Sequence, residues 1–424
     1  MKSSRSDVVV LGAGVAGLSA ALPLARTGAR VTLLDAAERV GGRLFSLNSG
    51  GPGAPVELGA EFVHGEPEEL IALVREAGLE LERVPDEHYE LVNGVARPAE
   101  ALSGVLELLE SAPAEPDASA LELSQSLGLD AEAAHWFAQF VEGFHAAPLD
   151  RVNACSILRQ TRGSESQQRV VGGYGRLVEY LRAELERLGA SFVMRAEARS
   201  VEVRRGHVSV VTPGLPVHEA EACIVALPLG VLRAPPAMGG VAWQPRPEWL
   251  AALVDRFEMG HVWRVTVSLR EPVAPWKDLP GGAFVHALDA SFPTWWSRPS
   301  PGESQLVAWC GGPKTARFAR GTDAQEGALA TLAELSQLTP AKLSALVTDV
   351  RVHDFINDPL VRGAYPYELV GGEDGPDLGP VAGSPPLLFA GDYLDADELG
   401  TVGAAVKSGT AAARVLLGAR PAAA

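Results

Sequence analysis

The sequence predicts an α/β fold whose doubly wound, mostly parallel sheet is assembled from segments far apart in the chain. An uninterrupted apolar run at residues 8–11 is typical of a parallel strand covered on both faces. A similar run at residues 387–391 lies near the other end and precedes a Gly- and Ala-rich helical pattern at 403–417. A long region of mixed strand and helix pattern separates the two runs. We therefore expect a discontinuous sheet domain with an α+β domain inserted into it.

The first strand runs into a glycine-rich turn with the spacing G-x-G-x-x-G. Gly12 permits a tight turn from strand to helix, Gly14 lets the backbone approach a pyrophosphate, and Gly17 allows close packing of helix on strand. Ala16 lies within the same turn. Because the N-terminus of a helix attracts anions, this unit predicts a Rossmann-like site for the ADP half of a dinucleotide.

The next apolar run, Val31–Leu34, ends at an acidic residue. Asp35 stands about twenty residues after the glycines, where a carboxylate accepts hydrogen bonds from a ribose hydroxyl. The same charge would repel a 2′-phosphate, which disfavours NADP. The Gly41-Gly42-Arg43 sequence that follows narrows the predicted dinucleotide to FAD. Pro23 lies inside the intervening helix and is expected to bend it.

Composition limits the classes of protein that this chain can be. Its 424 residues are 47% hydrophobic, enough for two or three domains with a large core. No apolar run is long enough to span a bilayer, so no membrane-spanning helix is expected. The formal charge of −17 disfavours nucleic acid and anionic membranes and would mildly attract a cationic substrate. Cys155, Cys223 and Cys310 lie far apart, so we expect reduced thiols, no metal site and a cytoplasmic protein.

The remaining elements follow from periodicity and turn residues. Helical spacing is found at 68–82, over much of 85–162 apart from a Pro- and Ala-rich loop at 112–118, at 176–188 and near 323–338. Strand-like runs are found at 191–194, 200–203, 208–212, 223–227, 262–269 and 305–309. The Ala-rich tail after Gly418 is expected to be disordered.

This order of elements predicts two domains made of five segments. The dinucleotide-binding domain is expected to comprise residues 1–72, 166–240 and 371–424. The second, substrate-binding domain is expected to comprise a mostly helical segment, 73–165, and a mixed-sheet segment, 241–370. The active site should lie between the two domains.

Six motifs in order resemble the flavin-containing amine oxidases of the monoamine and polyamine oxidase superfamily, and the resemblance runs nearly end to end. The form Glu-Leu-Gly-Ala-Glu-Phe-Val-His-Gly is most similar to the polyamine oxidase branch. The motifs are the fingerprint 12–17, Gly41-Gly-Arg43, Glu57-Leu-Gly-Ala-Glu-Phe-Val-His-Gly65, Gly172-Gly-Tyr-Gly175, Ile224-Val-Ala-Leu-Pro-Leu-Gly-Val-Leu232, and Phe389-Ala-Gly-Asp392 with the closing Ala405-Val-Lys-Ser-Gly409.

The resemblance implies an FAD-dependent oxidase of amines. Such an enzyme removes a hydride equivalent from the carbon beside a neutral amine to flavin N5, and the reduced flavin passes its electrons to O₂ to give H₂O₂. The N-terminus of the closing helix, at Thr401 to Gly403, would stabilise negative charge at flavin N1 and O2. The residues expected to hold FAD are Gly12, Gly14, Ala16, Gly17, Asp35, Gly42, Arg43, Gly59, Ala60, Val201, Gly391, Asp392, Thr401, Val402 and Ala405.

Glu61 and His64 are the substrate-side candidates that the resemblance implies. A carboxylate at Glu61 could pair a distal ammonium, and the imidazole of His64 could hydrogen-bond the substrate amine. The alternative is that Glu61 bonds the backbone and His64 is a core histidine. Glu57 is expected on the cofactor side.

The chain departs from the family pattern at two places. Arg264 stands where the family keeps a lysine near flavin N5, and Thr401 stands where many members have a cage tyrosine. Tyr365, Tyr367, Trp295 or Trp296 could supply replacement aromatic walls. No cysteine lies where the covalent-flavin members carry theirs, so FAD is expected to be bound non-covalently.

These departures leave several functions open. The favoured one is an oxidase of a polyamine-like substrate with O₂ as electron acceptor. An amino-acid oxidase with Arg264 clamping the substrate carboxylate is an alternative. The others are a flavin desaturase or dehydrogenase of an apolar substrate and a flavoprotein that has lost catalysis. Nothing in the sequence predicts the oligomeric state.

Overall fold

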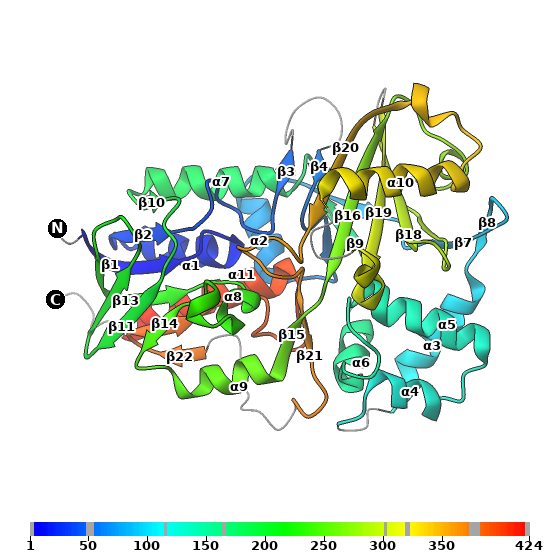
Figure 1. The fold of residues 1–424 in the computed structure, drawn as a ribbon. Helices are drawn as coiled ribbons and strands as arrows, with labels where there is room; N and C mark the ends of the chain where they lie inside the picture. Colours follow the sequence, from blue (N-terminus) through cyan, green and yellow to red (C-terminus); the bar gives the residue numbers. More distant parts are fainter. Residues whose placement is uncertain are drawn as a thin grey trace.

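The computed structural model describes residues 4–47, 55–113, 117–162, 167–300, 303–318, 323–372 and 382–419. Part of the predicted loop at 112–118 and nearly all of the tail after Gly418 therefore lie outside the described residues. Figure 1 shows two halves side by side, with both termini at the far end of the first half. The predicted α/β class is confirmed, because each half is built on its own large sheet with helices packed against it.

The first half contains the predicted doubly wound sheet, in the strand order β10-β2-β1-β13-β12-β11-β14, with β23 paired to β13 and β22 paired to β23. Its central pairs are parallel, and Val8 lies opposite both Val31 and Ala222. The strands are β1 Ser4–Leu11, β2 Val31–Leu34, β10 Ser191–Val193, β11 Ser200–Arg204, β12 His207–Val211, β13 His218–Val225, β14 Ala242–Gln244, β22 Ala382–Ser384 and β23 Leu387–Phe389.

Among the described residues, four helices pack on or beside one face of this sheet, while α8 (Leu229–Arg233) and α9 (Glu248–Arg256) pack on the other face. The first helix, α1 (Val15–Arg26), continues through Pro23 and packs against the closing helix α11 (Val402–Ala419). The two helices approach closely, since a Cβ added at Gly409 would lie 2.1 Å from the carbonyl oxygen of Ala16. The other two are α7 (Tyr174–Arg187) and α2 (Glu68–Glu76). The predicted helix at 68–82 is too long, because Gly78 takes a positive φ and strand β6 (Leu81–Val84) follows.

The second half contains a seven-stranded sheet in the order β20-β16-β19-β18-β17-β7-β8, with α10 (Ala324–Leu338) packed on β16 and β20. The prediction that residues 85–162 are mostly helical missed β7 and β8. Asn93 and Gly94 both have positive φ, and they form the tight turn of this hairpin. The strands are β7 His88–Val92, β8 Val95–Pro98, β16 Val262–Leu269, β17 Phe284–His286, β18 Thr294–Ser300, β19 Glu303–Gly311 and β20 Val347–Asp354.

A helical cluster lies beside this sheet, drawn in cyan and teal in Figure 1. It consists of α3 Glu100–Ser111, α4 Ala120–Ser126, α5 Ala131–Ala138, the π-helical turn Gln139–Phe144 and α6 Ala154–Arg162. Between the halves run β5 Phe62–His64, β6 Leu81–Val84 and β9 Gln167–Val170, together with β15 Phe257–Met259 and β21 Pro366–Glu368. The rest are β3 Ser46–Leu47, β4 Val56–Glu57, α8 Leu229–Arg233, α9 Glu248–Arg256 and 3₁₀ turns at Pro236–Met238, Trp276–Asp278, Gly312–Arg317 and Leu343–Ala345.

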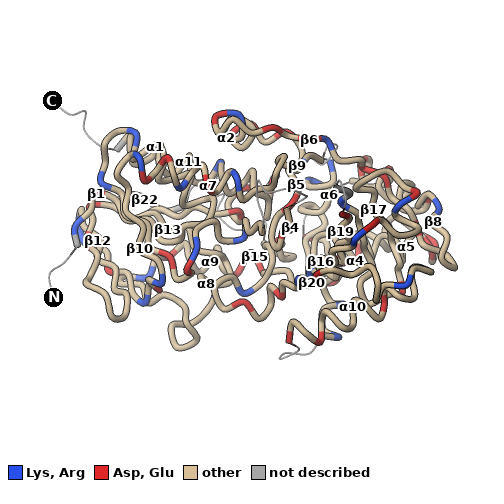
Figure 2. Tube along the Cα trace, turned by 90° about the horizontal axis from the view of Figure 1, so that it is seen from above, with Lys and Arg blue, Asp and Glu red and all other residues tan. Residues whose placement is uncertain are grey.

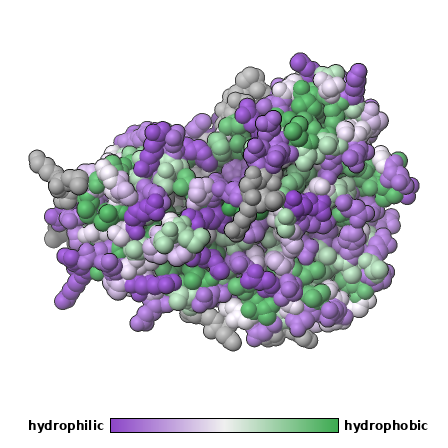
Figure 3. All heavy atoms as spheres, in the orientation of Figure 1, coloured by the Kyte–Doolittle hydropathy of each residue, from purple (hydrophilic) through white to green (hydrophobic). Residues whose placement is uncertain are grey.

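The surface is mixed in charge and polarity. Acidic and basic residues are interspersed along the outside of both halves (Figure 2). Hydrophobic residues form separated groups on the face shown in Figure 3. Within the described part of the chain, no helix is long and apolar enough to cross a membrane.

Candidate active site

A large cavity of about 470 Å³ is lined by residues of both halves. At one end lie the glycine-rich turn after β1, the end of β2 and the start of α11. At the other end lie aromatic and histidine side chains from β5, β7, β17 and β18 and from the π-helical turn. The predicted nucleotide site and the predicted substrate wall therefore belong to one chamber.

The glycine-rich turn leaves an open space at Gly14 and nowhere else along the motif. A Cβ on Gly12 would come 2.5 Å from the carbonyl oxygen of Ala226, and one on Gly17 would come 2.0 Å from that of Gly12. At Gly14 the nearest atom to such a Cβ is the Cα of Gly42, at 3.9 Å. This space, beside the N-terminus of α1, suits the pyrophosphate of a dinucleotide.

Asp35 stands at the end of β2 with its carboxylate against the turn. Its two oxygens accept backbone N–H groups from Ala13 at 2.6 Å and Ala37 at 2.8 Å. Burial raises the pKa of Asp35, and the two backbone hydrogen bonds oppose this shift. Each carboxylate oxygen keeps further lone-pair capacity. The residue can therefore hold the turn and accept a ribose hydroxyl.

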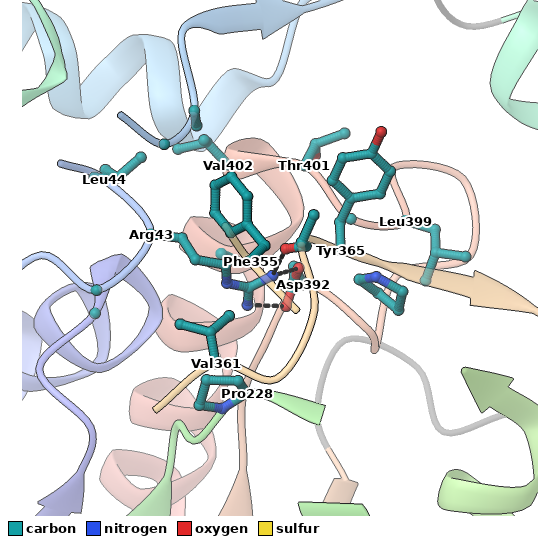
Figure 4. Close-up of a pocket in the computed structure, with 18 of the residues that line it drawn as sticks. Arg43, Leu44, Pro228, Phe355, Val361, Tyr365, Asp392, Leu399, Thr401 and Val402 are labelled. Carbon is teal, nitrogen blue, oxygen red and sulfur yellow. Dashed lines mark hydrogen bonds and ion pairs between the residues drawn. The ribbon is translucent and has the colours of Figure 1, made fainter. Parts of the chain in front are cut away.

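Arg43 and Asp392 join the first and last segments of the chain at the cavity wall. The guanidinium of Arg43 donates to both carboxylate oxygens, at 2.6 and 2.7 Å, and also to the carbonyl of Ala364 at 3.0 Å. Figure 4 shows this pair beside Thr401 and Val402. The positive charge of Arg43 is thus held rigidly where it lines the cavity.

The closing helix begins at the same wall. The hydroxyl of Thr401 accepts the N–H of Ala404 at 3.0 Å, which caps the first turn of α11. Other N–H groups of that turn have no acceptor within the helix itself, and they carry the positive end of its dipole. Thr401, Val402 and Ala405 all line the cavity.

Most of the predicted cofactor residues line this cavity, but two do not. Gly17 packs behind the turn, and Val201 is fully buried in the hydrophobic core under β11. The structure therefore gives no support for a side-chain contact of Val201 with the cofactor. The residues that line the cavity are Gly12, Gly14, Ala16, Asp35, Gly42, Arg43, Gly59, Ala60, Gly391, Asp392, Thr401, Val402 and Ala405.

Glu61 is occupied by arginines. Its carboxylate meets Nη2 of Arg264 at 2.5 Å and Nε of Arg169 at 2.8 Å, and Nε1 of Trp296 lies 3.2 Å away. Burial would raise the pKa of Glu61, but Arg169, Arg264 and Arg298 outweigh it and lower that pKa to about 2. Glu61 lines the cavity with its charge already compensated by two arginines, and the suggested pairing with a distal ammonium would have to compete with them.

Arg264 lines the cavity with its charge already compensated. It is 2% exposed, and besides Glu61 its guanidinium donates to the carbonyl of Gly59 at 3.2 Å. Its charge also lies over the ring of Trp296, 5.4 Å from the centroid. Arg264 is thus a fixed cation in the cavity wall, and its correspondence to the family lysine stays a prediction.

His64 and Tyr365 lie on the substrate side. Burial lowers the pKa of His64 to about 4, so this imidazole is neutral at pH 7. Its ring meets Phe144 edge-on at 5.9 Å. Tyr365 donates its hydroxyl to the carbonyl of Phe144 at 2.5 Å, and its ring is nearly parallel to that of Trp309 at 6.4 Å.

The other suggested positions separate into wall and core. Tyr365, Tyr367 and Trp296 line the cavity, whereas Trp295 is buried in the core of the second sheet. Glu57 also lies away from the cavity lining, where it accepts hydrogen bonds from Ser46 and from the backbone of Tyr174. Glu57 therefore braces the start of α7.

Sequence reasoning missed a group of polar residues at the substrate end. His88, Gln139, His145, Gln167 and His286 all line the cavity. The available signals were the Asn-Gly turn that identifies the hairpin of His88 and the interrupted helix pattern before His145, which forms a π-helical turn. Within the described residues, no cluster of side chains is suited to hold a metal ion.

Comparisons with known proteins agree with this geometry. Residues 15–417 match the model of the family described as flavin containing amine oxidoreductase. Polyamine oxidase 4 of Oryza sativa subsp. japonica is 25% identical over 454 residues, covering 97% of this chain and 88% of that protein. Putrescine oxidase of Kocuria rosea is 49% identical over 74 residues, covering 18% of this chain and 15% of that protein.

Two solved structures show the same fold. Wild-type putrescine oxidase bound to putrescine has a TM-score of 0.82 at 20% identity, and the match covers 98% of this chain and 100% of that chain. Cyclohexylamine oxidase from Brevibacterium oxydans IH-35A has a TM-score of 0.77 at 19% identity, covering 96% of this chain and 98% of that one. Since the family model spans nearly the whole chain, the protein belongs to the flavin-containing amine oxidoreductases and is an FAD-dependent enzyme that oxidises amines.

Proposed function

We propose that this enzyme binds FAD without a covalent bond and oxidises an amine that carries more than one basic nitrogen, such as a diamine or polyamine. The observation that carries the proposal is the continuous cavity, which joins the open space at Gly14 to a chamber walled by aromatic rings and histidines. The residues present fit FAD, because the space at Gly14, the Asp35 carboxylate and the start of α11 offer contacts for pyrophosphate, ribose and flavin in turn.

Bound FAD supplies the acceptor for the hydride equivalent and, with O₂, the route to H₂O₂. The contribution of the chain itself is position and charge. The N–H groups at the start of α11 favour negative charge beside Thr401 and Val402. The guanidinium of Arg264, which is paired with Glu61, is held in the wall of the same cavity.

An amine must be neutral at nitrogen to lose a hydride from the adjacent carbon. His64 is neutral at pH 7, so its ring can accept a hydrogen bond from the amine. Tyr365 and Trp309 give apolar walls that orient a carbon chain and exclude water. The net charge of −17 favours the approach of a cation.

Two observations favour a polyamine-like substrate over the alternatives. Similar proteins along the whole chain are named polyamine oxidases, and a similar structure contains putrescine. Against an amino-acid substrate, Arg264 is already paired with Glu61, so a substrate carboxylate would have to compete with that buried carboxylate. An apolar substrate would leave the polar groups of the chamber without partners.

Non-covalent attachment predicts that acid precipitation of the purified protein releases FAD into the supernatant. The physical reason is the absence of a cysteine thiol at the site, since Cys155, Cys223 and Cys310 are buried and none lies among the described residues that line the cavity. Visible and fluorescence spectra of supernatant and pellet check this expectation. Flavin that stays with the pellet would contradict it.

The substrate class is tested by the release of H₂O₂ in air from 1,4-diaminobutane, 1-aminobutane and a panel of L-amino acids. The proposal predicts the highest kcat/KM for the diamine and no peroxide above background from the amino acids. A preference for an amino acid would show instead that Arg264 leaves Glu61 to clamp a carboxylate. Peroxide from none of them would remove the oxidase assignment.

A further inference from the structure

Polar groups at the substrate end of the cavity fall into those already bonded and those still open. A ligand can use only the second kind, because buried polar groups seek partners and a saturated group has none to offer. Glu61 belongs to the first kind, since two guanidiniums and Trp296 surround it.

The histidines on β7 and β17 are also saturated. Nε2 of His88 lies 3.3 Å from the carboxylate of Asp86, and Nδ1 of His88 lies 2.9 Å from Nε2 of His286. With the proton of His88 on Nε2, His286 donates from Nε2 and its Nδ1 accepts the hydroxyl of Thr294, 3.4 Å away. Both nitrogens of both rings are therefore used inside one hydrogen-bonded chain.

One ring nitrogen of His145 has no hydrogen-bond partner among the described residues. Its side chain bonds Gln160, whose amide N–H group is donated to Ser156, so the oxygen of Gln160 accepts from His145. Nε2 of His145 is buried without a partner among the described residues. Burial lowers the pKa of His145 to about 4, with His64 adding to the effect, so Nε2 carries a lone pair at pH 7.

The side-chain carbonyl oxygen of Gln167 accepts no hydrogen bond from the described residues. The residue is 6% exposed and lines the cavity, and Oε1 has no hydrogen-bond partner among the described residues. Because the terminal torsion of glutamine is soft, a small rotation brings this oxygen to a ligand. Gln167 lies directly opposite His64 in the β5–β9 pair, so the two side chains point to the same face.

These observations place two buried acceptors without hydrogen-bond partners in the described part of the chain near His64, one on the neighbouring strand and one on the residue after the π-helical turn. Acceptors without donors suit a group rich in N–H, and a primary ammonium offers three. Asp86, which also lines the cavity, adds a negative charge close enough to act on His64. An ammonium placed there would satisfy both acceptors and meet a favourable charge.

We propose that His145 and Gln167 form an acceptor subsite that binds the second, non-reacting ammonium of a di-cationic amine. This subsite rests on the proposed function. It means that two residues outside the family motifs determine the preference for a di-cationic over a mono-cationic amine. Both are specificity residues, because they would contact the end of the substrate that does not react.

The test compares 1,4-diaminobutane with 1-aminobutane on the FAD-loaded protein and its variants. In anaerobic stopped-flow reduction, Gln167→Leu and His145→Phe should each raise the half-saturating concentration of the diamine about tenfold or more, because a hydrogen bond to a charged group is lost. The value for 1-aminobutane should change less than about twofold, and Gln167→Glu should restore diamine binding. Equal weakening of both amines, or no weakening of either, would overturn the subsite.

Gln168→Leu is the matched control. Gln168 neighbours Gln167 on β9 but points to the opposite face, where it bonds Glu66 at 3.4 Å. This variant should bind the diamine like the wild type. The rise in unfolding temperature caused by 1,4-diaminobutane gives a readout that needs no oxidation. If that rise occurs in the wild type and is lost in Gln167→Leu while no amine reduces the flavin, the subsite stands and the proposed function fails.

Discussion

Gly14→Val is expected to give a folded protein that purifies without FAD. The backbone at Gly14 has φ −70°, which any residue adopts, and an added Cβ meets no atom closer than 3.9 Å. The valine side chain would instead fill the space that we assign to the pyrophosphate. Circular dichroism should match the wild type, while the ratio of flavin to protein absorbance should fall close to zero.

Two further variants show whether this effect is specific. Gly104→Val makes the same change on helix α3, where a Cβ would meet nothing within 4 Å, and it should keep its FAD. Gly12→Ala should impair folding itself, because its Cβ would lie 2.5 Å from a carbonyl oxygen at φ +96°. A yellow, fully loaded Gly14→Val protein would mean that the dinucleotide does not cross the turn at this glycine.

Glu61→Gln is expected to lower the free energy of unfolding by about 3–5 kcal/mol, the usual cost of removing one partner from a buried ion pair. The physical reason is that Arg169 and Arg264, both nearly fully buried, would lose their shared counter-charge. Urea unfolding of the FAD-loaded protein measures this difference. The pH dependence has a defined sign, because the pKa of Glu61 is lowered to about 2. The contribution of ionised Glu61 to the free energy of unfolding is complete above the ordinary carboxylate pKa and is lost as the pH falls towards 2.

The same substitution at an exposed pair provides the control. Glu202 pairs with Arg204 on the surface of β11 at 2.8 Å, and Glu202→Gln should change stability by no more than about 0.5 kcal/mol. Arg264→Lys, which keeps a charge near Glu61, should cost less than Glu61→Gln. A Glu61→Gln protein as stable as the control would show that the arginines are solvated or paired elsewhere.

The parts of the fold that the sequence predicted are those whose signals are local. The unit from β1 to β2 needs an apolar run, a glycine turn and a terminal acid, and all of them lie within residues 8–35. The hairpin of β7 and β8 was missed because its strands are short and half-polar, and because its Asn93-Gly94 turn was not weighed. Its pairing with β17 is a long-range contact that periodicity does not reveal.

The candidate site divides in the same way. Glycines and Asp35 could be found from spacing, since their roles depend on neighbouring backbone. The pairing of Glu61 with arginines could not be found from the sequence. Its partners Arg169 and Arg264 come from β9 and β16, which the fold brings together from distant segments. His145 and Gln167 carry no motif at all, and only the hydrogen bonds around them show that they remain open. The proposed division into five domain segments stays a prediction.

Anaerobic mixing of the FAD-loaded enzyme with 1,4-diaminobutane tests most directly whether cofactor and amine meet in the same chamber. The account predicts that the visible absorbance of the oxidised flavin bleaches without O₂. It also predicts that later admission of O₂ restores this absorbance and releases one equivalent of H₂O₂ per flavin. An absorbance that does not change with the amine would contradict the account, and so would bleaching that O₂ reverses without peroxide.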